Sequence, residues 1–182
     1  MLPELIVREK DKIIERWVQL IVETYPSYSS RFLLQQTDRF QNPVGYTITT
    51  ETEALFHSFL NDDIDNTGVI ALDNLIRVRT VQNFTSAQAV GFVFSLKQAI
   101  REVINKCNQV DISLNEILTL ETRIDQLALK AFDSYMNCRD RINEIRIKDI
   151  KRQAYLFTDA NNFKNVIPRQ KEHETNDPTS CE

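Results

Sequence analysis

Apolar residues recur with helical spacing through the N-terminal part of the chain, separated by short polar segments. Pro3 suits the first turn of a helix, where a missing N–H costs nothing. The apolar residues after it predict one helix that runs to the Tyr25–Pro26 pair. They are Ile6, Ile13, Ile14, Trp17, Leu20, Ile21 and Val22. After a serine-rich turn at 27–30, the pattern predicts a shorter helix over residues 31–40.

The next helix has two candidate starts. Asn42 can cap it, with Pro43 as its first residue. Thr50 and Glu53 form a competing capping box. We prefer the earlier start because the apolar stripe reaches back to Val44. Its members are Val44, Ile48, Leu55, Phe56, Phe59 and Leu60.

A central helix is predicted from Thr85, which forms a second capping box with Gln88. Its main stripe is Ala89, Val93, Leu96, Ile100, Val103 and Cys107. Val90 and Phe94 widen the stripe on one flank and Phe92 lies on another side, which is typical of a helix packed between neighbours. Gly91 inside a helix costs about 1 kcal/mol relative to alanine. We therefore expect another helix to cross close to Gly91.

From Ser113 the helical pattern continues without Gly or Pro to about Ala154, on the order of 60 Å. Residues at heptad spacing form one seam, and we expect its first half to lie in the core. The second half, mixed in charge, is expected to project or to pair with a second copy. The seam comprises Ile117, Ile124, Ala128, Ala131, Tyr135, Cys138, Ile142 and Ile145. Its part from Ala131 to Ile145 is the predicted interaction or dimer seam.

Composition favours a helical protein with one core. The 182 residues include only 3 glycines and 5 prolines, against 42% hydrophobic and 26% charged residues. We expect an all-α, globin-like or bundle-like domain of about five to six helices over residues 1–157, with a long protruding C-terminal helix. The polar segment 158–182 is expected to be a disordered tail.

The net charge, the N-terminal sequence and the cysteines argue against several classes of partner, location and metal site. The net charge of −4 argues against nucleic acid as the main partner, since phosphate binding needs a clustered basic surface. The charged N-terminus is unlike a signal peptide, and no apolar run is long enough to insert into a membrane, so we expect a cytoplasmic protein. The cysteines, Cys107, Cys138 and Cys181, lie far apart and indicate reduced thiols rather than disulfides or a zinc site.

The loop 61–68, which precedes a predicted helix over 69–83, partly matches a calcium-binding EF-hand loop. The matching residues are Asp63, Asp65, Thr67, Gly68 and Ile70. The position of the bidentate glutamate carries Asn74 instead, so we prefer a plain loop with solvated acids and predict no metal.

Candidate chemistry is sparse. His57 lies between Phe56 and Phe59 and could ligate a haem iron or another metal, but a lone histidine on an apolar helix is more often an interfacial or core residue. With two histidines and no glycine-rich phosphate loop, we predict no catalytic residues, no enzyme and no cofactor.

Three basic residues lie closest to the predicted apolar faces: Arg77, Arg79 and Lys97. They could bind a carboxylate or phosphate ligand in a cleft. Alternatively, their aliphatic stems cover apolar surface while their charges pair with acids in solvent.

Four blocks of the sequence resemble one family. They are "ERWVQLIVETYP" (15–26), "DRFQNPVGYTI" (38–48), "IRVRTVQNFTSAQAVGFVFSLKQAIRE" (76–102) and "RIDQLALKAFDSYMNCRDRINEIR" (123–146). Together they are similar to the RsbRD N-terminal domain, the sensor domain of RsbR-type co-antagonists. The resemblance reaches from the first helix to about Arg152.

The resemblance implies an all-helical signal-input or partner-binding domain without catalysis. In RsbR-like proteins such domains resemble non-haem globins, dimerise and pass a signal through a C-terminal helix to a STAS output domain. Here a polar tail follows the long helix, so we expect a stand-alone member. Single-domain relatives look like accessory proteins of anaerobic, sulfur-metabolising bacteria, which suggests a partner in a redox or electron-transfer complex.

Three hypotheses follow. The first is a regulatory or adaptor module that binds a protein partner or a second copy through the dimer seam, with helix packing around Gly91 shifting the long helix between two arrangements. The second is a small-ligand receptor with a pocket between the "NPVGY" helix start and the central helix, anchored by Arg77, Arg79 or Lys97. The third is a structural subunit of a larger assembly.

Overall fold

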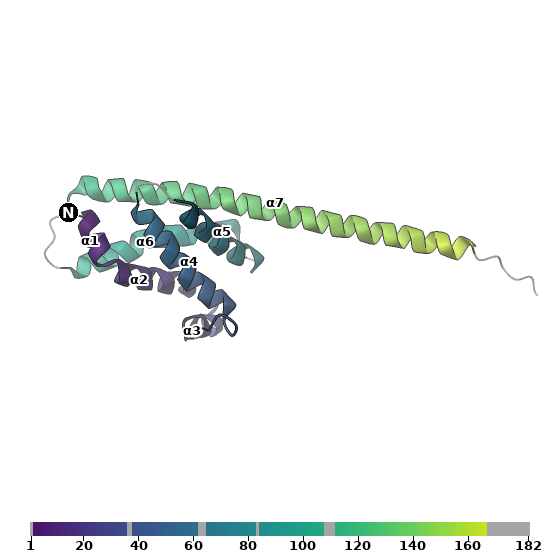
Figure 1. Ribbon diagram of the computed structural model, residues 1–182, viewed down its shortest axis with the longest axis horizontal. Coiled ribbons are helices and arrows are strands. Elements are labelled where there is room, and N and C mark those ends of the chain that lie inside the picture. Colours follow the sequence, from purple (N-terminus) through teal and green to yellow (C-terminus); the bar gives the residue numbers. More distant parts are fainter. Residues whose placement is uncertain (1, 36–37, 62–64, 83, 108–111, 167–182) are drawn as a thin grey trace, which may run out of the picture. The chain divides into compact units, whose positions relative to one another are not determined.

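The computed structural model describes residues 2–35, 38–61, 65–82, 84–107 and 112–166. Within these ranges the chain forms seven α-helices and no strand (Figure 1). The predicted all-α fold with a long C-terminal helix is confirmed. Residues 1–141 form one compact unit, here called the body, and residues 142–182 form a second unit.

The first expected helix is divided in two, α1 (Leu2–Arg8) and α2 (Lys10–Glu23). Glu9 separates them, with φ −99° and ψ 14°. Backbone hydrogen bonds continue through the break, since Glu9 N donates to Leu5 O and Ile13 N to Glu9 O. The apolar spacing therefore persists across Glu9, which is why the pattern alone indicated one helix.

Helix α3 (Ser27–Gln35) begins four residues earlier than expected and ends five earlier. The prediction of a helix over 31–40 was wrong because the serines form its first turn, where Ser29 N donates to Pro26 O at 2.8 Å. Beyond it, Phe40 N donates to Asp38 Oδ1 at 2.8 Å. Such an Asp side-chain turn competes with helix formation.

Helix α4 (Pro43–Leu60) starts where Asn42 predicted, and the competing start at Thr50 is not used. Asn42 Oδ1 accepts from Gly45 N at 2.8 Å, while its Nδ2 donates to Leu33 O at 3.1 Å. The cap thus also fastens α3 to the beginning of α4.

Helix α5 (Asn66–Val81) starts three residues before its predicted first residue, because Asp65 caps it. Asp65 Oδ1 accepts from Gly68 N and from Ser58 Oγ, at 2.9 Å and 2.8 Å. These bonds lower the pKa of Asp65.

Helix α6 (Ser86–Lys106) begins with the predicted capping box of Thr85 and Gln88. The close helix crossing expected at Gly91 is wrong, because no atom would lie within 4 Å of a Cβ added there. Gly91 is half-buried, and no helix packs onto it. Gly45 is the glycine at a close approach, where a Cβ would lie 2.8 Å from Asn42 Cγ and nearer still to Leu33 O.

Helix α7 (Leu114–Val166) continues past the predicted end at Ala154. The segment predicted as a tail is therefore helical over 158–166, and residues 167–182 lie outside the described residues.

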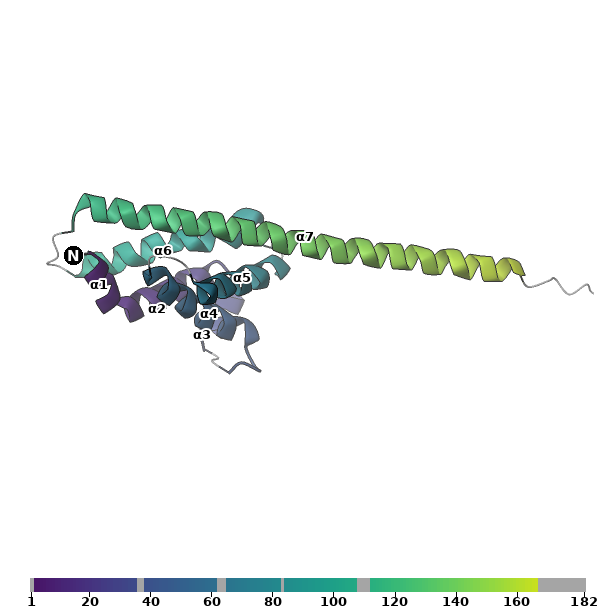
Figure 2. The same ribbon diagram turned by 45° about the horizontal axis from the view of Figure 1, so that its top comes forward.

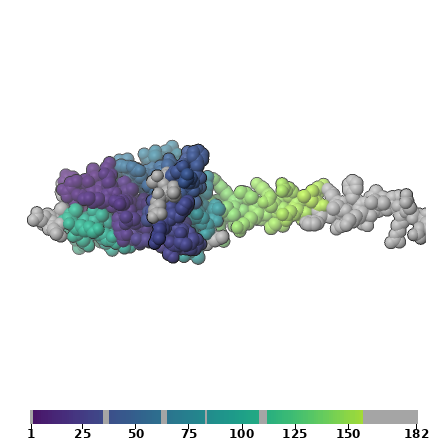
Figure 3. Space-filling view, turned by 90° about the horizontal axis from the view of Figure 1, so that it is seen from below, coloured from purple at the N-terminus to yellow at the C-terminus, as the bar shows by residue number. Residues whose placement is uncertain are grey.

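The core of the body forms around Trp17. Its indole Nε1 donates to Phe92 O at 2.9 Å, and its rings pack against Phe56 and Phe92. Helices α4 and α5 form one closely packed pair, and α2 and α6 another. The two ribbon views show α6 and the first half of α7 extending along each other (Figures 1 and 2). In the space-filling view, the purple α1–α2 segment borders the teal end of α6 (Figure 3).

Candidate functional site

Arg79 is the most unusual polar residue of the body, because its side chain is only 1% exposed. Its Nη2 donates to Thr24 Oγ1 at 3.0 Å and to Gln88 O at 2.9 Å. The guanidinium carbon lies 4.4 Å from the ring centroid of Phe84 and 5.5 Å from those of Tyr25 and Phe92. Arg79 therefore joins the end of α2 and the beginning of α6 to α5 inside an aromatic cage.

The buried charge of Arg79 has no carboxylate partner among the described residues. Its Nε and Nη1 have no hydrogen-bond partner there, and neither does the buried hydroxyl of Tyr25. Burial lowers the pKa of Arg79. Burial also raises the pKa of Tyr25, and the positive charge of Arg79 opposes that rise. Cation–π attraction to the three rings supplies part of the compensation that an acid would give.

The three predicted basic ligand residues do not form one site. Arg77 is exposed on α5, whereas Arg79, two residues later on the same helix, is buried in the core. Lys97 is on α6, where its Nζ lies 2.6 Å from Asp125 Oδ1 and 5.7 Å from the ring centroid of Phe94. The pocket expected beside the central helix therefore does not have these residues as a common anchor.

His57 and the EF-hand-like loop also differ from a ligand site. His57 is exposed on α4, with Nε2 4.0 Å from Glu53 Oε1. Thr67, Gly68 and Ile70 lie within α5 rather than in a loop, and Asp63 falls outside the described residues. In the part of the chain that the structure describes, no group of three or more potential ligands could hold a metal ion.

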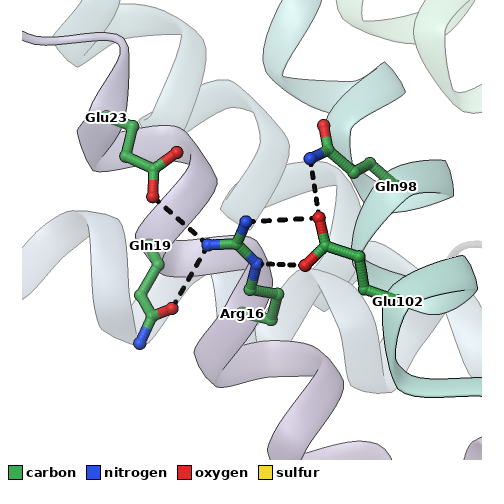
Figure 4. Close-up of polar contacts among 5 residues, drawn as sticks. All are labelled: Arg16, Gln19, Glu23, Gln98 and Glu102. Atoms are coloured by element: carbon green, nitrogen blue, oxygen red, sulfur yellow. Dashed lines mark hydrogen bonds and ion pairs between the residues drawn. The ribbon is translucent and has the colours of Figure 1, made fainter. Parts of the chain in front are cut away.

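A polar cluster fastens α2 to α6 on the surface of the body (Figure 4). Arg16 donates to both carboxylate oxygens of Glu102, through Nε at 2.5 Å and Nη2 at 3.2 Å. Its Nη1 reaches Gln19 and Glu23, and Gln98 donates to Glu102 at 2.7 Å. The hydrogen bonds from Arg16 lower the pKa of Glu102 to about 2. This cluster stabilises the packing of α2 against α6. It is not a ligand site, since its charges are already paired with one another.

The predicted dimer seam is divided by the structure. Ala131 and Tyr135 are 0% and 5% exposed and belong to the core of the body, so their assignment to an intermolecular seam is wrong. Cys138 is half-buried against the same core. Of the remaining seam residues, Ile142 is half-buried and Ile145 is exposed. Heptad spacing did not distinguish packing against the chain's own helices from packing against a partner.

A second apolar face of α7 is open to solvent in the body. Leu129, Phe132 and Met136 follow i, i+3, i+7 spacing and are 68%, 48% and 42% exposed. We call these three residues the outer face. The spacing was visible in the sequence, but it competed with the stronger seam through Ala131.

Two ion pairs join α6 to α7 shortly before the outer face. Lys97 pairs with Asp125 and Arg101 with Glu121, so α6 and α7 run antiparallel at this point. Phe94, which lies one turn before Lys97 on α6, is also 48% exposed.

In the second unit, the helix from Ile142 onward also carries exposed apolar residues. Ile145, Ile147, Ile150, Tyr155 and Leu156 are all exposed. Basic and acidic residues alternate with them. A helix with apolar side chains on an otherwise charged surface is typical of one that pairs with another helix.

Comparison with known families decides the classification. Residues 11–148 match the model described as the RsbT co-antagonist protein rsbRD N-terminal domain. The chain belongs to this family. The RsbRD N-terminal family is one of regulatory, sensor-type domains in signalling, and it is not a known enzyme family.

Among curated proteins, this RsbRD N-terminal domain is 22% identical to an uncharacterized protein of Archaeoglobus fulgidus over 142 residues. The match covers 78% of this chain and 84% of the archaeal one. No solved structure matches the chain. None of the described helices has the length and apolar character needed to cross a membrane.

Proposed function

We propose that this RsbRD N-terminal domain is a non-catalytic regulatory module that acts by binding a second copy of itself through α7. Family membership supports the regulatory role. The observation that carries the choice of surface is the outer face, where three large apolar side chains remain exposed on a helix whose opposite side is buried. Monomeric proteins rarely leave a contiguous apolar surface uncovered without a binding role.

A second copy is favoured as the occupant over an unrelated protein. In a two-fold symmetric dimer both copies use the same surface patch. The outer face of one copy would therefore cover the outer face of the other, and no separate partner surface is needed. The exposed isoleucines of the second unit provide the same kind of surface along the rest of α7. Mixed charges beside them, such as Lys148 and Asp149, would fix the pairing of the two helices.

The experiment is sedimentation equilibrium on the full chain with single substitutions in each part of α7. Phe132→Glu should weaken self-association at least tenfold, which corresponds to about 1.4 kcal/mol. Ile150→Glu should act in the same direction. Both residues are exposed, so thermal unfolding of the two variants should resemble that of the wild type.

Matched controls introduce the same charge at exposed polar positions of α7, namely Asn137→Glu and Gln153→Glu. They should leave association unchanged. Tyr135→Lys is unsuitable as an interface probe, because Tyr135 is buried and its loss would damage the body. A wild-type chain that stays monomeric at high concentration, or association that tolerates both Phe132→Glu and Ile150→Glu, would contradict the proposal.

A further inference from the structure

The body contains an apolar cavity of about 280 Å³, open to solvent on one side, between α1, the C-terminal end of α4 and the first turns of α7. Its walls include Leu2, Ile6, Phe59, Leu60 and Leu120. Leu2, Ile6 and Phe59 also belong to the hydrophobic core, so these walls are fixed by packing. Small-molecule sites in proteins are typically apolar hollows of this kind with a few polar groups that orient the ligand.

One end of the cavity carries a positioned cation. Arg123 lines the cavity, and its Nη2 donates to Phe59 O at 2.5 Å and to Asn61 O at 2.6 Å. Its guanidinium carbon lies 4.9 Å from the ring centroid of Phe59. These contacts hold the guanidinium at the end of α4 through Nη2, and its Nε and Nη1 form no hydrogen bond with another described residue.

The other end is marked by Glu116, which accepts from Leu2 N at 3.1 Å and from Ser113 N at 3.2 Å. Glu116 and Arg123 are seven residues apart on α7, or about 10 Å along the helix. The carboxylate of Glu116 is thus engaged with backbone donors and distant from the guanidinium. The cavity therefore has a basic end at Arg123, an apolar middle and an acidic end.

We infer that this cavity binds a small amphipathic carboxylate, with its head group at Arg123 and its apolar chain against Leu2, Ile6 and Phe59. A carboxylate can accept a charge-assisted hydrogen bond from Nε or Nη1 of Arg123, whereas an alcohol carries no charge and an ammonium group would be repelled. The volume of about 280 Å³ lies at the lower end of the range for small-molecule sites, roughly 300–1,000 Å³, so the ligand is expected to be small. A straight-chain acid such as octanoate is a suitable probe.

The position differs from the pocket expected beside Arg77, Arg79 and Lys97, and none of these residues lines the cavity. Binding here does not depend on self-association, so the two proposals can fail separately.

The test is isothermal titration of the full chain with sodium octanoate, together with thermal unfolding in its presence. Saturable binding at one site per chain and a rise in the unfolding temperature are expected. 1-Octanol and octylammonium, which have the same chain and a neutral or cationic head, should bind at least tenfold more weakly. Absence of saturable octanoate binding, or equal binding of the three probes, would overturn the inference.

Two substitutions locate the site. Arg123→Gln should weaken octanoate at least tenfold and remove the preference for octanoate over 1-octanol. Val7→Trp should block binding of both, because Val7 lines the cavity yet is 54% exposed, so a larger side chain can enter without disturbing the core. The control is Arg101→Gln, an exposed arginine on α6 outside this cavity, which should bind octanoate like the wild type.

Arg123 also holds the end of α4, so the folding of Arg123→Gln is checked by circular dichroism before titration. If that variant does not fold, Val7→Trp decides the question alone. Octanoate binding that persists unchanged in folded Val7→Trp would place the ligand elsewhere and overturn the assignment.

Discussion

Arg79 and Arg16 are held in the body in opposite ways. Arg16 lies on the surface and is bound by the carboxylate of Glu102, with Glu23 and Gln19 beside it. Arg79 is buried and is bound by a hydroxyl, a carbonyl and three aromatic rings. Both connect α6 to the N-terminal helices. Arg16 does so by charge pairing, which solvent and salt weaken. Arg79 does so by packing and by hydrogen bonds that are shielded from water.

The contrast shows that a basic residue in a helical sequence can act as a core side chain. Replacing a buried charge by an apolar side chain of similar volume is often neutral, whereas truncating it leaves a cavity. For Arg79, volume is therefore expected to contribute more to stability than charge. For Arg16, charge is expected to contribute more to stability than volume, because its guanidinium pairs with Glu102 in a partly exposed cluster.

The largest expected effect is that of Arg79→Ala, which should lower the free energy of unfolding by roughly 3–5 kcal/mol through the cavity it leaves. Arg79→Met fills most of the same volume and should stay within about 1.5 kcal/mol of the wild type. Urea unfolding followed by the fluorescence of Trp17, the single tryptophan, measures both. Equal losses in the two variants would show that the hydrogen bonds to Thr24 and Gln88, and not the volume, hold this part of the core.

An intermediate effect is expected from acid. The pKa of Glu102 is about 2 in the folded chain against an ordinary value of 4.5, so its stabilisation is complete above pH 4.5 and is lost as the pH falls toward 2. Glu102→Gln should therefore lose less stability than the wild type between about pH 5 and pH 2.5. Urea midpoints measured across this range test the prediction.

Glu15→Gln is the matched control for the acid experiment, since Glu15 is exposed on α2, on the same helix as Arg16. It should keep the acid sensitivity of the wild type. If Glu102→Gln and Glu15→Gln have the same pH profile, the pairing with Arg16 is not what makes the chain sensitive to acid.

The smallest effect is expected at Gly91, one residue before Phe92 in the cage of Arg79. Nothing lies within 4 Å of a Cβ there, so Gly91→Ala should raise the free energy of unfolding by about 0.5–1 kcal/mol through helix propensity alone. Gly45→Ala should do the opposite, because its Cβ would collide with Asn42 and Leu33. Urea unfolding measures both variants, and a destabilised Gly91→Ala would show that α6 needs flexibility beside Arg79.

The loss of the expected crossing at Gly91 also changes the signalling hypothesis. A shift in helix packing around Gly91 has no close contact to act on, since that position is open. The cavity beside Arg123 touches α7 directly and is the better starting point for a ligand effect on that helix.

The sequence predicted those elements whose signals are local. Asn42 with Pro43, and Thr85 with Gln88, located the starts of α4 and α6, because a cap needs only residues within one turn. The break at Glu9 and the early start of α3 were missed, because the apolar spacing continues through Glu9 and because the serines at 27–30 are equally typical of a turn. Local sequence patterns therefore predict where a helix begins better than they predict where it breaks.

By itself the sequence determined the all-helical class, the long last helix and the family, since periodicity, the scarcity of glycine and proline, and ordered sequence blocks are properties of the chain alone. Only the tertiary structure decided which apolar face of α7 is buried, that Arg79 lies in the core, and that Arg123 lines a cavity. Each of these depends on which distant helices meet. A face is buried only when another helix packs against it. Helical spacing shows which faces are apolar, but it does not show which of them another helix will cover.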